Sequence, residues 1–382
     1  MNLSRRNMIN LVGGGAVLAA VGAFGFKATR APLTAYMPWD RAGEYEDPRM
    51  RALSWALLAP NPHNRQPWLA DLSESGAITL YVDPDRLLPH TDPFNRQITI
   101  GLGCFLELLR MAAAEDGYQA DLMLFPQGSN AKALDQRPIA RIALTANSAL
   151  ARDPLFAWVP ARRSNKEPYD TTRSLSPELL TQMSAAATKG TRFGGTVDAA
   201  QVAEWRALTR EALRIEAVTP HTFQESVDLF RIGRHEVDAN PDGIDFSGPM
   251  FESMHLTGMF NREVAADPTS FAFKVGMDAF FDNTDTAMGH VWLVTADNSR
   301  ETQITTGADW LRVNLAATAQ GLGFQPLSQA LQEYPEMAEP YAQVHERLAP
   351  DGGTVQMLAR IGYGPVVGTS PRWPLESKIR NA

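Results

Sequence analysis

The chain contains an internal repeat, which restricts it to folds built from two similar halves. Shifting the 382-residue sequence by 206 positions aligns Thr99–Gln119 with Thr305–Gln325 without a gap. In both stretches small and aliphatic residues recur at helical spacing, and a Gly ends the run as at a helix C-terminus. Ala and Leu are common in any helix, so chance similarity stays an alternative. We interpret the repeat as a duplicated unit.

Strand-like runs accompany the helices in both halves. Apolar and β-branched residues gather in short runs at Ile78–Val82, Arg141–Leu144, His290–Val294 and Val355–Ile361. Helices mixed with short strands in each half predict an α+β architecture.

Composition argues against several classes of function. A net charge of −8 argues against a nucleic-acid partner. The single cysteine, Cys104, excludes an intramolecular disulfide and lies in an apolar run that predicts burial. The histidines lack metal-ligand spacing, so we expect no metal site. Asp238–Gly243 resembles the start of a calcium loop, but Pro249 stands where a bidentate Glu is required, which favours a simple turn.

The amino terminus predicts where the protein works. Ser4-Arg5-Arg6-Asn7 precedes an uncharged stretch, Met8–Phe26. We interpret residues 1–31 as a twin-arginine export signal, with an ordinary membrane anchor as the alternative. This predicts passage through the Tat translocon and a periplasmic or otherwise extracytoplasmic location, at the inner membrane if the leader is not cleaved. The Pro/Arg-rich stretch Ala28–Glu46 is the only plausible linker.

Two short segments carry the chemistry. Arg162-Arg163-Ser164-Asn165-Lys166 offers two guanidiniums, a hydroxyl and an ammonium, the donor set that a phosphate monoester accepts. His63-Asn64-Arg65-Gln66-Pro67-Trp68 places side-chain amides beside an aromatic, which suits the edge of a planar heterocycle. Paired arginines alone most often lie on a solvated surface, and Trp68 favours core packing over ring stacking.

With two further segments, this pattern resembles the flavin-dependent nitroreductase family. The likeness rests on the runs Pro60–Trp68, Arg162–Lys166 and Gly307–Gln329, and on Gly362-Tyr363-Gly364 with Pro371-Arg372-Trp373-Pro374. It is specifically similar to the Acg-type branch, in which one chain carries two nitroreductase-like halves. The resemblance implies two tandem halves packed as a pseudo-dimer, residues 45–150 and 151–382, each a mostly antiparallel sheet flanked by helices.

The same resemblance implies one intact FMN site for each chain. Asn64 and Gln66 would reach from the first half toward a flavin whose phosphate the second half holds. His63 would replace a hydroxyl contact or merely pack. The second half would supply the phosphate and ribityl contacts, the edge of the ring and a further cation, namely Arg162, Arg163, Ser164, Lys166, Pro326, Leu327, Ser328, Gln329 and Arg372. No catalytic side chain is implied, because flavin N5 carries the chemistry.

Residues 227–285 have no counterpart in the first half. In the Acg-type branch an inserted segment covers the flavin as a lid, so this stretch is a candidate lid that excludes water. Its many Met and Phe residues equally suit an ordinary helical hairpin that fills its own core.

The sequence therefore favours an exported FMN oxidoreductase that passes hydride or electrons to a nitroaromatic or quinone. The donor would be NAD(P)H, a quinol or a redox protein. A flavin-sequestering protein with a closed lid and little turnover is the alternative, and a cofactor-free descendant is the third reading. The chain would act as a monomeric pseudo-dimer or as a homodimer.

Overall fold

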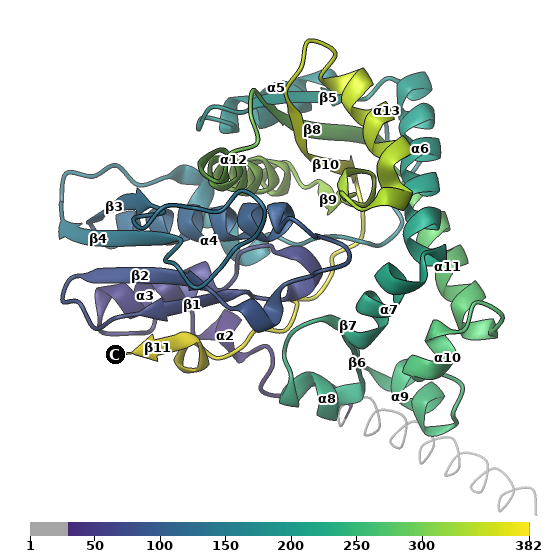
Figure 1. Ribbon diagram of the computed structural model, residues 1–382, viewed down its shortest axis with the longest axis horizontal. Coiled ribbons are helices and arrows are strands. Elements are labelled where there is room, and N and C mark those ends of the chain that lie inside the picture. Colours follow the sequence, from purple (N-terminus) through teal and green to yellow (C-terminus); the bar gives the residue numbers. More distant parts are fainter. Residues whose placement is uncertain (1–29, 382) are drawn as a thin grey trace, which may run out of the picture.

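The computed structural model describes residues 30–381, so almost all of the predicted leader lies outside the described residues. The described chain is an α+β structure, which confirms the predicted class (Figure 1). One sheet has the strand order β11-β1-β2-β4-β3, and a second has the order β5-β8-β10-β9. The four strand runs predicted from the sequence correspond to β2, β4, β8 and β10.

Both sheets are mostly antiparallel, and only the β1–β11 pair within them is parallel. The strands of the first sheet are β1 (Trp68–Asp71), β2 (Ala77–Val82), β3 (Tyr118–Leu124), β4 (Ala140–Ala146) and β11 (Ile379–Asn381). Those of the second are β5 (Arg192–Thr196), β8 (Gly289–Thr295), β9 (Gly323–Pro326) and β10 (Thr354–Gly362).

Helices cover these sheets and connect the two halves. In the first half they are α2 (Met37–Asp40), α3 (Pro48–Ala56), η1 (Pro62–Asn64), η2 (Pro84–Arg86) and α4 (Arg96–Glu115). In the second half they are η3 (Pro154–Ala161), α5 (Pro177–Ala186), α6 (Ala199–Val218), α12 (Arg300–Ala319), η4 (Gln329–Leu331), η5 (Pro335–Met337), α13 (Ala338–Leu348) and η6 (Leu375–Lys378).

The repeated helices α4 and α12 pack against each other at the centre of the molecule (Figure 1). Their contact is reciprocal: a Cβ on Gly103 would lie 2.2 Å from the Ile304 carbonyl oxygen, and one on Gly307 would lie 2.0 Å from that of Ile100. Cys104 is buried in this contact, as predicted. Among the described helices, α4 alone is long and apolar enough to span a membrane, and its burial marks it as a core helix.

The structure corrects the register of the repeat. Both helices are 20 residues long and begin with Arg96 and Arg300, which is a shift of 204 residues (300 − 96) rather than 206. Both are followed by a glycine with positive φ, Gly117 and Gly321, at the same shift. The predicted register was therefore two residues off, and the connection after α12, residues 320–322, is one residue longer than the connection after α4, residues 116–117.

The segment between α6 and β8 forms a separate group of short elements, which we call the insert (residues 220–284). Its elements are α7 (Pro220–Asp228), β6 (Phe230–Ile232), α8 (Gly233–Ala239), β7 (Ile244–Phe246), α9 (Pro249–Leu256), α10 (Arg262–Ala266) and α11 (Phe271–Thr284). Phe251, Met254 and Phe260 pack into an apolar cluster within the insert, whereas Met250 and Phe271 are exposed. Part of the Met and Phe set therefore fills the insert's own core.

Asp242 fastens the insert to the first half. Its carboxylate accepts hydrogen bonds from Arg231 within the insert, at 2.7 Å, and from Arg86 of the first half. The side chain of Asp242 is buried, and the indole N–H of Trp373 also donates to it at 3.3 Å. One buried carboxylate thus joins the insert, the first half and the C-terminal segment. Asp242 belongs to the segment that resembles the start of a calcium loop, and its carboxylate is occupied by these three contacts.

The C-terminal segment returns to the first half. After β10 the chain runs through Arg372 and η6 and ends in β11, which pairs with β1. The path brings Arg372 beside residues of the first half, and its Nε donates to the Leu57 carbonyl oxygen at 2.7 Å.

Candidate functional site

The segments that carry the family resemblance meet at the junction of the two halves. The Arg162–Lys166 segment lies alongside β9, and the backbone N–H of Asn165 donates to the Phe324 carbonyl oxygen at 2.9 Å. The Leu58 carbonyl oxygen accepts from Arg162 Nη2 at 3.2 Å and from Arg372 Nη2 at 3.3 Å. One carbonyl of the first half therefore joins two arginines that lie 210 residues apart (372 − 162).

Three guanidiniums gather here, those of Arg162, Arg163 and Arg372, and we call them the arginine cluster. Arg162 and Arg372 are almost fully buried. Burial, then the positive charge of the neighbouring arginines, lowers the pKa of Arg162 to about 10 and that of Arg372 to about 9. Among residues 30–381 no ion pair joins the cluster to a carboxylate. Buried like charges without a counter-ion are costly unless an anion binds beside them.

The cluster retains donors that no described group uses. Arg162 Nη1 and Arg163 Nε are buried and have no hydrogen-bond partner within residues 30–381, and the Ser164 side chain is exposed. Arg372 differs, because all three of its nitrogens donate to protein acceptors, including Asn64 Oδ1 at 2.7 Å. Arg372 therefore supplies positive charge to the site, while Arg162 and Arg163 supply both charge and free N–H groups.

The amides of Asn64 and Gln66 are occupied by protein partners. Asn64 Nδ2 donates to the Pro371 carbonyl oxygen at 3.0 Å. Gln66 is fully buried, its Nε2 donates to the Pro241 carbonyl oxygen at 2.7 Å, and its Oε1 accepts from the Trp373 backbone N–H at 2.9 Å. These two side chains tie the first half to the insert and to the C-terminal segment.

The backbone around these amides is strained. His63, Asn64 and Gln66 have φ values of 46°, 51° and 50°, in the left-handed region. Each such residue costs about 1–3 kcal/mol, except that Asn tolerates this region better, and such strain gathers at functional sites. The local sequence has no glycine to relieve it, so packing and the amide hydrogen bonds must maintain this conformation.

A second set of polar side chains lies around Lys166. Lys166 is exposed to solvent, and the surrounding protein lowers its pKa. Burial and then the positive charges of Lys166 and Arg65 lower the pKa of His63 to about 4, so its imidazole is neutral at pH 7. His63 Nε2 lies 3.4 Å from Ser226 Oγ of the insert.

Glu216 of α6 lies near Lys166. Its Oε2 is buried without a partner among the described residues, as are Gln332 Oε1 and Tyr334 Oη. Burial raises the pKa of Glu216 to about 7, against the lowering effects of Gln332, Gln329 and Lys166. Buried polar atoms without protein partners are expected beside a site that takes a polar ligand.

The raised pKa of Glu216 predicts a specific pH dependence. Because its folded pKa lies above the ordinary value of 4.5, the stability it contributes is present below pH 4.5 and is lost as the pH rises to about 7. Glu216→Gln should remove this loss. The difference in urea midpoint between the variant and the natural chain should shift in favour of the variant across that window. Parallel pH profiles would show that Glu216 is ionised throughout. His63 titrates in both proteins and cancels in the difference.

The remaining predicted contacts, Pro326 to Gln329, follow β9. The Leu327 backbone N–H donates to the Leu358 carbonyl oxygen at 2.8 Å, so the sheet uses this donor. Gln97 Nε2 of the first half donates to the Ser328 carbonyl oxygen at 3.3 Å. The Gln329 side chain lies near Glu216. The segment thus contacts the first half at Ser328 and lies near Glu216 at Gln329.

Sequence reasoning missed two residues of this site. Trp39 lies in the stretch interpreted as a linker, yet its ring lies 4.6 Å from the Arg163 guanidinium and 5.4 Å from that of Arg372. A large aromatic residue is unusual in a linker, and this was the signal in the sequence that Trp39 packs against the rest of the protein. Glu216 occupies the buried stripe of α6 with Leu208 and Ala212, so an acidic residue in an apolar helical pattern was the second signal.

No protein-family model matches the chain. It is 25% identical over 327 residues to "Putative NAD(P)H nitroreductase Rv3131" of Mycobacterium tuberculosis, which covers 82% of this chain and 84% of the relative. "Putative NAD(P)H nitroreductase acg" of the same organism is 37% identical over 75 residues, 20% of this chain and 22% of the relative.

Solved structures show a weaker likeness. The FMN-dependent nitroreductase NfnB from Mycobacterium smegmatis, in complex with NADPH, matches with a TM-score of 0.34 at 17% identity, over 58% of this chain and 94% of that one. The structure of "a putative nitroreductase" from Anabaena variabilis matches with a TM-score of 0.37 at 14% identity, over 76% of this chain and 69% of that one. The chain is thus similar to Rv3131 over most of its length and to Acg over a shorter stretch, in agreement with the resemblance that the motifs carry.

Proposed function

We propose that this chain is an FMN-dependent oxidoreductase of nitroreductase type. The arginine cluster is the observation that carries the proposal. The phosphate monoester of FMN is a doubly charged anion with several acceptor oxygens, and the cluster offers three positive charges that no carboxylate within residues 30–381 pairs with. Arg162 Nη1, Arg163 Nε and the exposed Ser164 hydroxyl supply donors that such a group accepts. The residues present therefore fit the cofactor.

The side chains of Lys166 and His63 suit the ring. Lys166 would place a positive charge near it, and His63, neutral at pH 7, offers one donor and one acceptor. Bound FMN would supply hydride or electron transfer through N5 to an electron-poor acceptor such as a nitroaromatic or quinone. The side chains of this chain would bind and orient the cofactor, and the insert would limit the access of water.

The donor and the location belong to the proposal as well. The names of the relatives support a nicotinamide donor, NAD(P)H. The predicted leader, Ser4 to Phe26, supports export by the twin-arginine route and an extracytoplasmic location. Because NAD(P)H is largely cytoplasmic, an exported enzyme would take electrons from a quinol or a redox protein.

A flavin-sequestering function is the second candidate, and one observation favours it. The insert is fastened to the rest of the molecule by the buried Asp242 and by the Gln66 amide. An insert held in this way would retain the cofactor and exclude large acceptors, which favours tight binding with little turnover.

An anaerobic reduction experiment separates these functions. The purified full-length protein is reconstituted with FMN and then mixed with NADPH, or with a quinol, while its absorbance is recorded. Bleaching by either donor, followed by reoxidation with a nitroaromatic or quinone, is the expected result. Bound FMN that resists both donors would favour sequestration. A protein that takes up no FMN would refute both functions.

A further inference from the structure

The residues that follow the predicted leader are bound to the insert. The backbone N–H groups of Leu33, Thr34 and Ala35 donate to the Asp238 carboxylate of α8 at 2.8–3.1 Å. Tyr36 Oη donates to Asp245 at 2.6 Å. This segment, residues 32–40, is therefore an ordered strap rather than a linker.

The other end of the strap lies on the arginine cluster. The Trp39 ring stacks near the guanidiniums of Arg163 and Arg372, and its indole N–H donates to the Ser370 carbonyl oxygen at 2.8 Å. The backbone N–H of Arg372 donates to the Ala35 carbonyl oxygen at 2.8 Å. A guanidinium that stacks through its face keeps its in-plane N–H groups available, so Trp39 can fix the orientation of Arg163 without using its free Nε.

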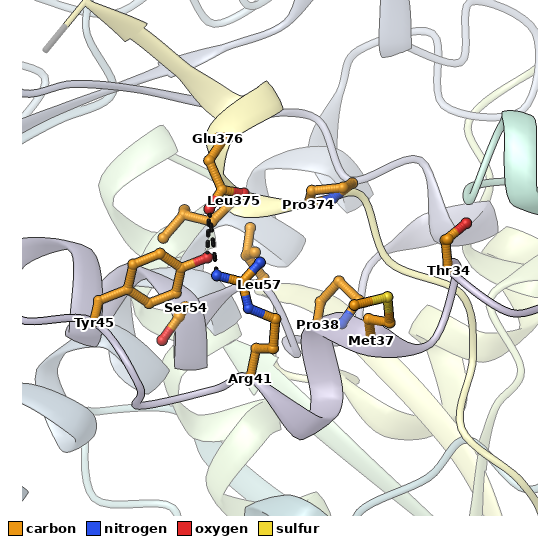
Figure 2. A pocket seen from close by; sticks show the side chains of 10 residues that line it. All are labelled: Thr34, Met37, Pro38, Arg41, Tyr45, Ser54, Leu57, Pro374, Leu375 and Glu376. Atoms are coloured by element: carbon orange, nitrogen blue, oxygen red, sulfur yellow. Dashed lines mark hydrogen bonds and ion pairs between the residues drawn. The ribbon is translucent and has the colours of Figure 1, made fainter.

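Between these two attachments the strap covers a cavity. Figure 2 shows Met37 and Pro38 of the strap facing Leu57 and Pro374 across a mostly apolar cavity of about 180 Å³. Side chains that border a cavity lose dispersion contacts on that side. The strap is therefore held mainly by its polar contacts to the insert and by the stacking of Trp39, and breaking either attachment should loosen it.

We infer that the strap closes the anion site and that Trp39 is a positioning residue for the arginine cluster. This inference rests on the proposed function for the identity of the anion, the phosphate of FMN. Because the strap joins the insert to the cluster, the phosphate leaves only when the strap is displaced. Asp238 does not contact the anion in this account. It holds the strap by accepting hydrogen bonds from three backbone N–H groups.

The inference predicts faster release of FMN from two variants that alter opposite ends of the strap. Trp39→Ala removes the stacking, and Asp238→Ala removes the hydrogen bonds from the three backbone N–H groups of the strap to the insert. Each should release FMN about 10-fold faster than the natural chain, since one cation–π contact or one set of charge-assisted hydrogen bonds is worth about a tenfold change. The measurement is the rise of free flavin fluorescence after dilution of the reconstituted full-length protein.

Two matched variants serve as controls. Trp39→Phe keeps an aromatic face and should restore most of the slow release. Asp267→Ala removes a carboxylate of the same insert, which accepts hydrogen bonds from the nearby Thr269. This variant should release FMN at the natural rate. If Asp238→Ala fails to fold, the comparison of Trp39→Ala with Trp39→Phe still decides the role of the strap.

The outcomes separate this inference from the proposed function. FMN release at the natural rate from both Trp39→Ala and Asp238→Ala would overturn the inference and leave the proposed function intact. A natural chain that binds no FMN would refute the proposed function. Titration with inorganic phosphate would then test the strap. Weaker phosphate binding by both variants supports the inference, and equal binding overturns it.

Discussion

Arg162→Met should weaken FMN binding by roughly 10–100-fold without lowering the stability of the chain in the absence of FMN. The weaker binding of FMN and the unchanged stability without FMN have different causes. Arg162 Nη1 is a buried donor to which the described part of the chain offers no partner, and a charge-assisted hydrogen bond to phosphate is worth about 1.5–3 kcal/mol. In the absence of the anion, Arg162 instead repels Arg163 and Arg372, and its removal relieves that repulsion.

Arg162→Met should also change the surrounding structure little. The Leu58 carbonyl oxygen loses the hydrogen bond from Arg162 but keeps the one from Arg372. Met retains much of the apolar stem, which limits the loss of packing. Calorimetric titration with FMN and a thermal unfolding curve without FMN measure the two effects. Arg152→Met, which alters an exposed arginine near Glu115, is the control and should change neither. Unchanged FMN affinity in Arg162→Met would show that the cluster does not hold the phosphate.

Gly103→Ala should destabilise the chain by roughly 3 kcal/mol, because the added methyl group has no space. Its Cβ would lie 2.2 Å from the Ile304 carbonyl oxygen and 2.9 Å from the Gly307 Cα, and both are backbone atoms. The helices α4 and α12 would have to move apart. Since these helices join the two halves, the site at their junction would be distorted as well.

Gly276→Ala is the matched control. Gly276 lies within α11, and a Cβ there would meet no heavy atom within 4 Å. This variant should gain about 0.5–1 kcal/mol from helix propensity. Thermal unfolding followed by circular dichroism compares the two. Equal midpoints for Gly103→Ala and the natural chain would contradict the close helix contact.

Much of the fold was predictable from local patterns. Helical spacing located α4 and α12, and runs of β-branched residues located β2, β4, β8 and β10, because burial of a regular apolar face leaves a periodic trace in the sequence. The register of the repeat was not predictable, because small and aliphatic residues recur at helical spacing in both helices, and a register shifted by two residues therefore also matches.

The candidate site was predictable only where residue chemistry is distinctive. Arg162 and Arg163 were identified because paired guanidiniums suit phosphate, and the structure places Arg372, which the resemblance implied as a further cation, in the same cluster. The partners of Gln66 could not be predicted, because Pro241 contributes a backbone carbonyl that any residue has. The strap was missed for a similar reason: its attachment to Asp238 uses backbone N–H groups, which leave no trace in side-chain composition.

Titration of the purified protein with FMN and with riboflavin tests the central claim most directly, because the two ligands share the ring and differ in the phosphate. If the arginine cluster holds the phosphate, FMN should bind at least about 100-fold more tightly than riboflavin, and Arg162→Met should reduce this difference. Equal affinities for the two ligands, or a difference that the variant leaves unchanged, would contradict the account.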